Sequence, residues 1–225
     1  MVRHGRRTGI THPTMLPDVV PPGDTRRVLT TDDFWVLIDA SAVATADQHE
    51  RLAWLTDRLA ERPADEVVDF AVRLDEARAR VDSWHMWGAA LHVCQGLCSD
   101  DGFHYFQAWL VGLGRETFER VAAEPDSLAD LPQIRRLAGR RVRDWDDDEW
   151  PDWESLDYVA GDAYKRVTGI ADGLDEAAEA RGHELSLSPD PTDKEWDLAD
   201  PVEVARRFPR LVALFPSNTR DRRHI

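Results

Sequence analysis

The residues with the clearest chemical potential lie in one short stretch that runs from Ser99 to His104. On a helix, side chains three and four positions apart share a face, so His104 would lie one turn beyond both Asp100 and Asp101. Two carboxylates and an imidazole can bind a divalent metal, and a bound metal can activate water for hydrolysis. A metal-assisted hydrolase that uses Asp100, Asp101 and His104 is therefore one hypothesis, although a further ligand must come from elsewhere in the chain.

The same stretch also has a structural explanation that needs no ligand. Ser99 is a suitable N-cap, and Asp100 and Asp101 would lie in the first turn, where carboxylates interact favourably with the helix dipole. A serine cap of this kind contributes about 1 kcal/mol. We therefore expect no cofactor and no metal, and Asp100, Asp101 and His104 remain only weak metal candidates.

Aromatic residues flank this stretch on both sides. Trp84 and Trp87 fall at helical spacing, and Tyr105 follows His104. Such residues belong to a core more often than to a binding surface, but an indole N–H that is free can also line a pocket. The candidate ligand-binding residues are therefore Trp84, Trp87, Ser99, Asp100, Asp101, His104 and Tyr105.

No established catalytic motif occurs in the chain. The sequence contains no glycine-rich phosphate loop, no Gly-x-Ser-x-Gly elbow and no His-Glu-x-x-His pair. Its two cysteines, Cys94 and Cys98, are too few for a disulfide scaffold and are expected to be reduced. Neighbouring aspartates make Cys98 a poor nucleophile. This absence favours a non-enzymatic ligand-binding, protein-binding or regulatory protein over the hydrolase.

Composition limits the partners. The 225 residues carry a formal net charge of −15, which argues against a nucleic-acid binder and against attraction to an anionic membrane surface. There is no run of apolar residues long enough to span a bilayer and no apolar region typical of a signal peptide. We expect a cytoplasmic protein whose partner is another protein or a small molecule.

Helical spacing of apolar residues predicts an all-α fold in a single compact domain. The predicted units are a disordered basic tail over residues 1–29, a helical domain over 30–216 and a disordered C-terminal tail over 217–225. Helices are expected from Thr30, from Asp47 to Glu61, Asp65 to Val81, Trp84 to Cys94, from Ser99, from Gly114 to Ala123 and from Tyr158 to Gly169. Residues 170–200 read as loop or a short helix, and Pro209 as the first turn of a last helix.

Three expectations concern how these helices pack. The 84–94 helix and the helix that begins at Ser99 are expected to form a central antiparallel pair, in which small residues from Gly88 onward allow close approach. The charged residues of the 65–81 helix, among them Asp75 and Arg78, are expected to face solvent. Residues 144–157 hold eight acids, no base and three tryptophans, which predicts a solvated loop that docks against the domain or a basic partner.

Three blocks of the sequence resemble a known family: Phe34-Trp35-x-Leu37-Ile38-Asp39, Trp84-x-x-Trp87-Gly88-Ala89-Ala90, and Cys98-Ser99-Asp100-Asp101-Gly102-Phe103-x-Tyr105-Phe106-x-x-Trp109-Leu110. They are similar to the bacterial domain-of-unknown-function family 4240. The segment Arg207-Phe208-Pro209-Arg210-Leu211 resembles the C-terminal end of that family's sequence. The resemblance implies a fold and a site but no activity. It also implies an arginine where this chain has Gln107; if that arginine pairs with Asp100 or Asp101 in relatives, the pairing is lost here.

Overall fold

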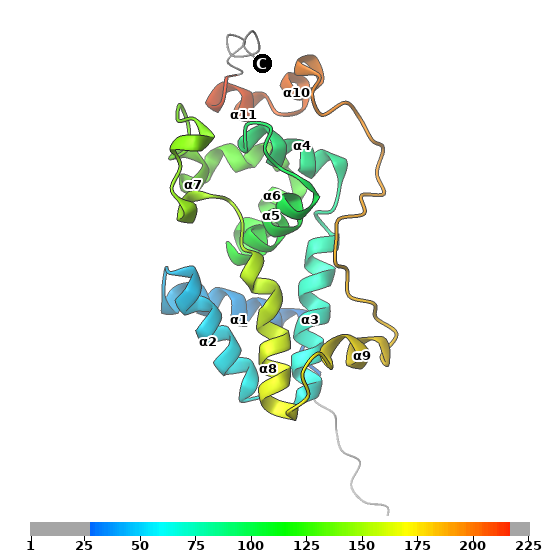
Figure 1. Cartoon of the computed structure of the whole chain (residues 1–225). Coiled ribbons are helices and arrows are strands. Elements are labelled where there is room, and N and C mark those ends of the chain that lie inside the picture. Colours follow the sequence, from blue (N-terminus) through cyan, green and yellow to red (C-terminus); the bar gives the residue numbers. More distant parts are fainter. Residues whose placement is uncertain (1–27, 217–225) are drawn as a thin grey trace, which may run out of the picture.

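A computed structural model of the chain describes residues 28–216, and this range contains helices and no strand (Figure 1). The all-α prediction is confirmed. The predicted tails lie outside the described residues, except for Val28 and Leu29. Leu29 is buried, and its N–H donates to the Asp69 carboxylate at 3.0 Å. The folded body therefore begins before the predicted boundary at residue 30.

The first group of helices comprises α1 (Thr31–Ala44), α2 (Gln48–Ala60), α3 (Ala64–Ala79), α8 (Tyr158–Thr168) and α9 (Leu174–Glu179), which form the lower half of Figure 1. α8 packs most extensively, against α2 and α3. The starts of α1 and α2 follow local capping rules: Thr30 and Asp33 form a capping box, and the Asp47 carboxylate accepts from the Glu50 N–H.

The second group occupies the upper half of Figure 1. It contains α4 (Trp84–Val93), α5 (Asp100–Gly112), α6 (Arg115–Ala123), the 3₁₀ helix η1 (Pro125–Asp130), α7 (Pro132–Arg135), α10 (Pro201–Arg207) and α11 (Pro209–Leu214). α11 packs on η1 and α4 and buries Phe208 and Leu211. Pro209 is the first residue of α11, as its fixed φ and missing N–H favour.

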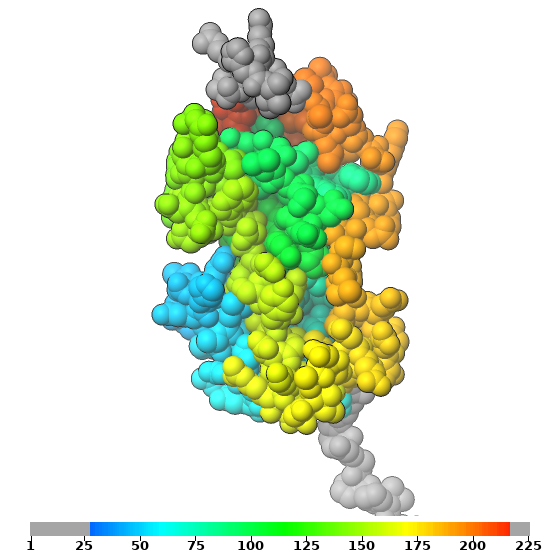
Figure 2. All heavy atoms as spheres, viewed as in Figure 1, coloured from blue at the N-terminus to red at the C-terminus, as the bar shows by residue number. Residues whose placement is uncertain are grey.

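Two irregular segments run between the groups. The first holds the 3₁₀ helices η2 (Val142–Asp144), η3 (Asp147–Glu149) and η4 (Glu154–Asp157). The second, which we call the strap, comprises residues 181–199 and runs beside α3 from α9 to α10 (Figure 1). The strap lies on the outside of the body in the space-filling view (Figure 2).

The expectation about the central helix pair needs correction. Trp87 of α4 does stack on Phe103 of α5, with ring centroids 4.8 Å apart, but the most extensive helix contacts involve α8. Gly88 makes room for the strap: a Cβ at Gly88 would lie 2.3 Å from the Trp196 ring. In α5, Gly112 makes room for Trp153 in the same way, at 2.4 Å.

No helix within residues 28–216 has both the length and the apolar character needed to cross a bilayer.

Candidate functional site

The predicted acidic turn lies at the exposed start of α5. Ser99 is the N-cap, and its hydroxyl accepts from the Gly102 N–H at 3.2 Å. Asp100 and Asp101 are exposed in the first turn. The geometry therefore contains the capping arrangement that the sequence predicts.

Trp84 and Trp87 lie on one side of α4 and stack on each other, with ring centroids 5.2 Å apart and planes 3° from parallel. The Trp87 indole N–H donates to the carbonyl of Cys98 at 3.2 Å. Both tryptophans are half-buried. The Trp87 indole thus joins α4 to the turn before α5.

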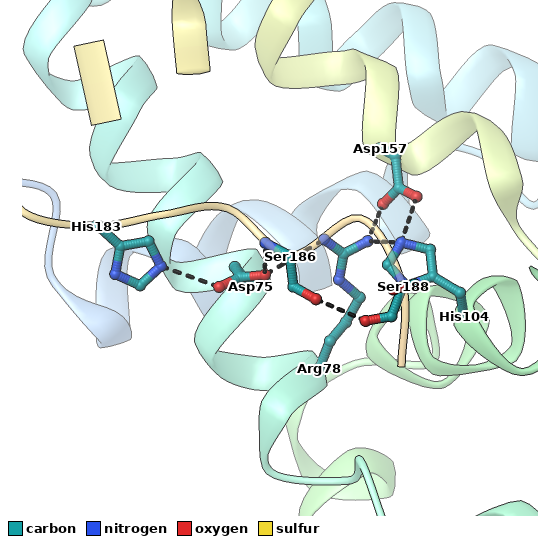
Figure 3. Close-up of polar contacts among 7 residues, drawn as sticks. All are labelled: Asp75, Arg78, His104, Asp157, His183, Ser186 and Ser188. Carbon is teal, nitrogen blue, oxygen red and sulfur yellow. Dashed lines mark hydrogen bonds and ion pairs between the residues drawn. The ribbon is translucent and has the colours of Figure 1, made fainter. Parts of the chain in front are cut away.

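The His104 side chain does not pair with Asp100 or Asp101, because it is buried and points toward Arg78 of α3 (Figure 3). Its Nε2 is 2.8 Å from the Arg78 guanidinium and 3.2 Å from the Asp157 carboxylate. Arg78 also donates to Asp157 directly. The imidazole, the guanidinium and the half-buried carboxylate thus form one largely buried group that joins α3, α5 and η4.

The charged face of α3 is only partly solvated, so that expectation is wrong for two residues. Glu76 and Arg80 are exposed, but Asp75 and Arg78 are buried. Asp75 accepts from His183 of the strap at 2.9 Å and lies 3.7 Å from Arg78 (Figure 3). The strap and η4 cover this part of α3, which the sequence of α3 alone does not reveal.

Gln107 points toward the turn that follows α3. The Gln107 amide donates to the Asp82 carboxylate at 3.1 Å, and Asp82 also accepts the Asp190 N–H of the strap at 2.7 Å. A longer arginine at position 107 would therefore reach Asp82, and the suggested pairing with Asp100 or Asp101 is not the one that this geometry favours. Burial is the main cause that raises the pKa of Asp82, and the charge of Asp190 adds to it.

We call Asp75, Arg78, Asp82, His104, Gln107 and Asp157 the polar cluster. A cavity of about 40 Å³ lies beside it, with walls from the cluster and from Ser186 and Ser188 of the strap. This volume accommodates a few water molecules and is far below the several hundred Å³ of typical small-molecule pockets. The Arg78 Nε is buried and has no hydrogen-bond partner.

The acidic stretch from residue 144 to 157 is anchored by its tryptophans. Trp145 and Trp153 are buried, and Trp150 is partly buried against the core. Arg51 lies over the Trp153 ring, 4.5 Å from its centroid. The prediction that these tryptophans dock on the domain agrees with this burial, and the anchors fix the positions of the intervening carboxylates.

Carboxylates from this stretch gather around two tyrosines. The Tyr158 hydroxyl donates to Glu154 at 2.9 Å. Burial and the charges of Glu154, Asp101 and Asp157 raise the pKa of Tyr105. Within residues 28–216, neither Asp101 nor Glu154 forms an ion pair. We call Asp101, Tyr105, Glu154 and Tyr158 the acidic face.

The two histidines of α4 and the two cysteines pack against the core. His85 and His92 pack against Phe208 and Phe215 respectively, and burial lowers the pKa of both imidazoles. Cys94 and Cys98 are free and buried. In the described part of the chain, no group of three or more His, Cys, Asp or Glu side chains could hold a metal ion, so Asp100, Asp101 and His104 are not brought together as a ligand set.

Sequence reasoning missed most of the polar cluster. It named His104 but paired it with Asp100 and Asp101, and it placed Asp75 and Arg78 on a solvated face. The available signal was weak: Asp75, Arg78 and Asp82 recur at three- and four-residue intervals, which is the spacing of one helix face, although α3 itself ends at Ala79. Their partners come from positions that are about 25 to 110 residues away in the sequence.

A family model described as "Protein of unknown function (DUF4240)" matches residues 29–166. The matched range holds the polar cluster and the acidic face, but it ends before the strap and before the Arg207 to Leu211 block. Neither the curated proteins nor the solved structures contain a match to the chain.

Proposed function

The chain belongs to the family described as "Protein of unknown function (DUF4240)"; because membership assigns no activity, we propose a function from the site itself. We propose that the chain is a non-enzymatic protein-binding domain whose acidic face binds a basic segment of a partner protein. The observation that carries the proposal is the grouping of two tyrosines with two carboxylates that form no ion pair within residues 28–216. Glu154 accepts from Tyr158, and the charges of Glu154 and Asp101 act on Tyr105.

The side chains of the acidic face are held in place by the fold, which distinguishes them from the other exposed carboxylates of this acidic protein. Trp153 is buried one residue before Glu154, and its N–H donates to the carbonyl of Tyr105 at 3.1 Å. The 3₁₀ helix η4 is therefore tied to α5 at the point where the tyrosines and carboxylates meet. Preorganised groups lose less conformational entropy on binding than mobile ones.

The chemistry of the face suits arginine or lysine. Carboxylates attract a cation over long range and speed encounter, and a tyrosine ring can hold a guanidinium through a cation–π contact. Tyrosine is also enriched at protein interfaces, where its ring and its hydroxyl both make contacts. Tyr158 is 57% exposed, so its ring is available to a partner.

The test uses a short fluorescent arginine-rich peptide and anisotropy titrations at several salt concentrations. The double variant Asp101→Asn with Glu154→Gln should bind the peptide about tenfold more weakly, or about 0.7 kcal/mol for each carboxylate removed. Tyr158→Ala should weaken binding further without changing the net charge.

The matched control removes the same two kinds of charge elsewhere. Asp175→Asn with Glu179→Gln changes two exposed acids of α9. If the face binds specifically, this control should retain nearly the affinity of the unchanged protein. Equal losses in both double variants would mean that the peptide senses only the net charge, and the proposal would then fail.

A further inference from the structure

The strap is held at the surface along its whole length. None of residues 181–199 is buried, whereas Ala178 of α9 and Val204 of α10 are buried on either side of it. Trp196 is the largest apolar anchor: its ring is half-buried on Gly88, and Arg207 lies 4.5 Å from its centroid. Before Trp196, Leu185 also packs partly buried against the core, and the other residues of this part of the strap contribute little apolar burial.

Polar contacts, in contrast, are regularly spaced along the strap. The Ser186 N–H donates to Asp75 at 3.0 Å, and the Asp190 N–H donates to Asp82 at 2.7 Å. Asp75 lies on α3, and Asp82 lies three residues beyond the end of α3. The two strap amides that bind them are four residues apart in the sequence, and an extended chain of four residues spans at most about 13 Å.

The Ser186 and Asp190 contacts are made by backbone N–H groups, which are present in every chain except at proline, whereas His183 and Asp193 of the strap add side-chain contacts to Asp75 and to the Trp84 N–H. Any extended segment with two N–H groups four residues apart could make the two backbone contacts. Asp75, Arg78 and Asp82 thus line a surface, which we call the groove, that accepts a peptide backbone. The strap passes over Asp75 and Arg78 there (Figure 3).

The strap fits this groove imperfectly. Arg78 keeps a buried Nε donor without an acceptor beside the cavity, and an unsatisfied buried donor costs about 1–3 kcal/mol. Asp190 also places a negative charge near Asp82, where like charges repel. An extended segment with a carbonyl near Arg78 and a basic residue in place of Asp190 would remove both defects.

We propose that the groove from Asp75 of α3 to Asp82 in the turn after it is a docking site for an extended, basic segment of a partner protein, and that the strap is an exchangeable occupant that covers it in the free chain. The groove lies within the residues that match the family, whereas the strap lies outside them. This surface is distinct from the acidic face, so either proposal can fail alone.

The first experiment follows hydrogen exchange in the unchanged full chain. The amides of Ser186 and Asp190 should exchange through an opening that leaves the amides of α3 and α11 protected. If these two amides exchange only together with global unfolding, the strap is a fixed part of the fold and the proposal is wrong. This measurement needs no variant.

The second experiment adds a fluorescent peptide with the sequence of residues 181–199 to two forms of the full chain. In the unchanged protein the strap competes at an effective concentration on the order of mM, so we expect no binding of micromolar peptide. The double variant Ser186→Pro with Asp190→Pro lacks both N–H donors in the strap and should bind the peptide at least about tenfold more tightly. In the double variant, a peptide with Asp190→Lys should bind about fivefold more tightly than the native peptide at low salt.

Two controls separate the groove from other effects. Leu187→Pro introduces the same ring at an exposed residue whose N–H makes no hydrogen bond within the described chain, and it should leave the strap in place. A peptide N-methylated at the positions of Ser186 and Asp190 should not bind the double variant. Equal binding of the methylated peptide, or no peptide binding after the strap has detached, would overturn the proposal.

Discussion

The Arg78 guanidinium shows how strongly one residue of this protein depends on distant partners. It is buried and contacts Asp157, His104 and Asp75, which come from η4, α5 and α3. Removing one member of such a group leaves the remaining charges without compensation in a poorly solvated place.

We therefore predict that Arg78→Met lowers the free energy of unfolding by about 3 kcal/mol, measured by urea denaturation. Arg80→Met is the matched control, because Arg80 lies two residues on and pairs with Glu119 at the surface. Its loss should stay below about 1 kcal/mol. Similar values for the two variants would mean that the buried group contributes no more than a surface pair.

Asp152 gives a pH-dependent prediction at the same scale. Burial, with the charges of Glu154 and Asp147, raises its pKa above the usual range. As pH rises through about 4, the carboxyl ionises first in the unfolded chain, so stability falls until the folded carboxyl has also ionised.

Asp152→Asn removes this dependence. Relative to the unchanged protein, the variant should gain stability as pH rises from about 3 to about 6 and keep that gain at pH 7. Thermal melting at a series of pH values checks this. A melting-temperature difference that is constant across the series would contradict the assignment to Asp152.

At the scale of elements, the N-cap of α5 provides the next prediction. Ser99→Ala removes the acceptor for the Gly102 N–H and should lower stability by about 1 kcal/mol in chemical denaturation. Ser99→Asp keeps an acceptor at the same position and should retain most of the stability. If both replacements cost the same, the hydroxyl has another role than capping.

Two helical glycines differ in what an added methyl group would meet. At Gly112 it would press on the ring of Trp153, which is buried, whereas at Gly88 it would meet the outer edge of Trp196, which is half-buried. Gly112→Ala should therefore cost about 2 kcal/mol through overpacking.

Gly88→Ala should be close to neutral in urea denaturation, because Trp196 can shift outward and alanine favours the helix by up to about 1 kcal/mol. The order of the two costs is the critical result. A larger cost at Gly88 would show that Trp196 is held as firmly as Trp153.

Most helices follow from local sequence. Apolar spacing and caps predict α2, α3, α4 and α8 to within a few residues, because each depends on neighbours along the chain. The site does not follow in this way. His104 contacts Asp157, and Asp75 contacts His183, only in the folded chain. The spacing of residues within α5 or α3 does not predict these long-range contacts. The role of Gly88 was missed for the same reason, since its neighbour Trp196 is more than 100 residues away.

At the scale of the whole molecule, the family-matched residues do not form a closed body by themselves. Phe208, Leu211 and Phe215 lie beyond residue 166 and are buried against the upper group of helices. Three such side chains contribute about 6 kcal/mol of burial, which is comparable to the total stability of many domains.

A chain that ends at residue 199 should consequently lose most of its cooperative thermal transition, as followed by circular dichroism. In the full chain, Val202→Ala alters an exposed residue of α10 and should leave the transition unchanged. A shortened chain that melts within a few degrees of the full one would show that the C-terminal helices are dispensable.

The distance between α4 and α11 along the chain also sets an order of events during synthesis. The surface of α4 that receives Phe208 and Leu211 leaves the ribosome about 120 residues before α11 does. At about 5–20 residues per second, that apolar surface of α4 stays uncovered by α11 for about 6–24 s. The upper group of helices can therefore complete its packing only after residues 208–214 have left the ribosome.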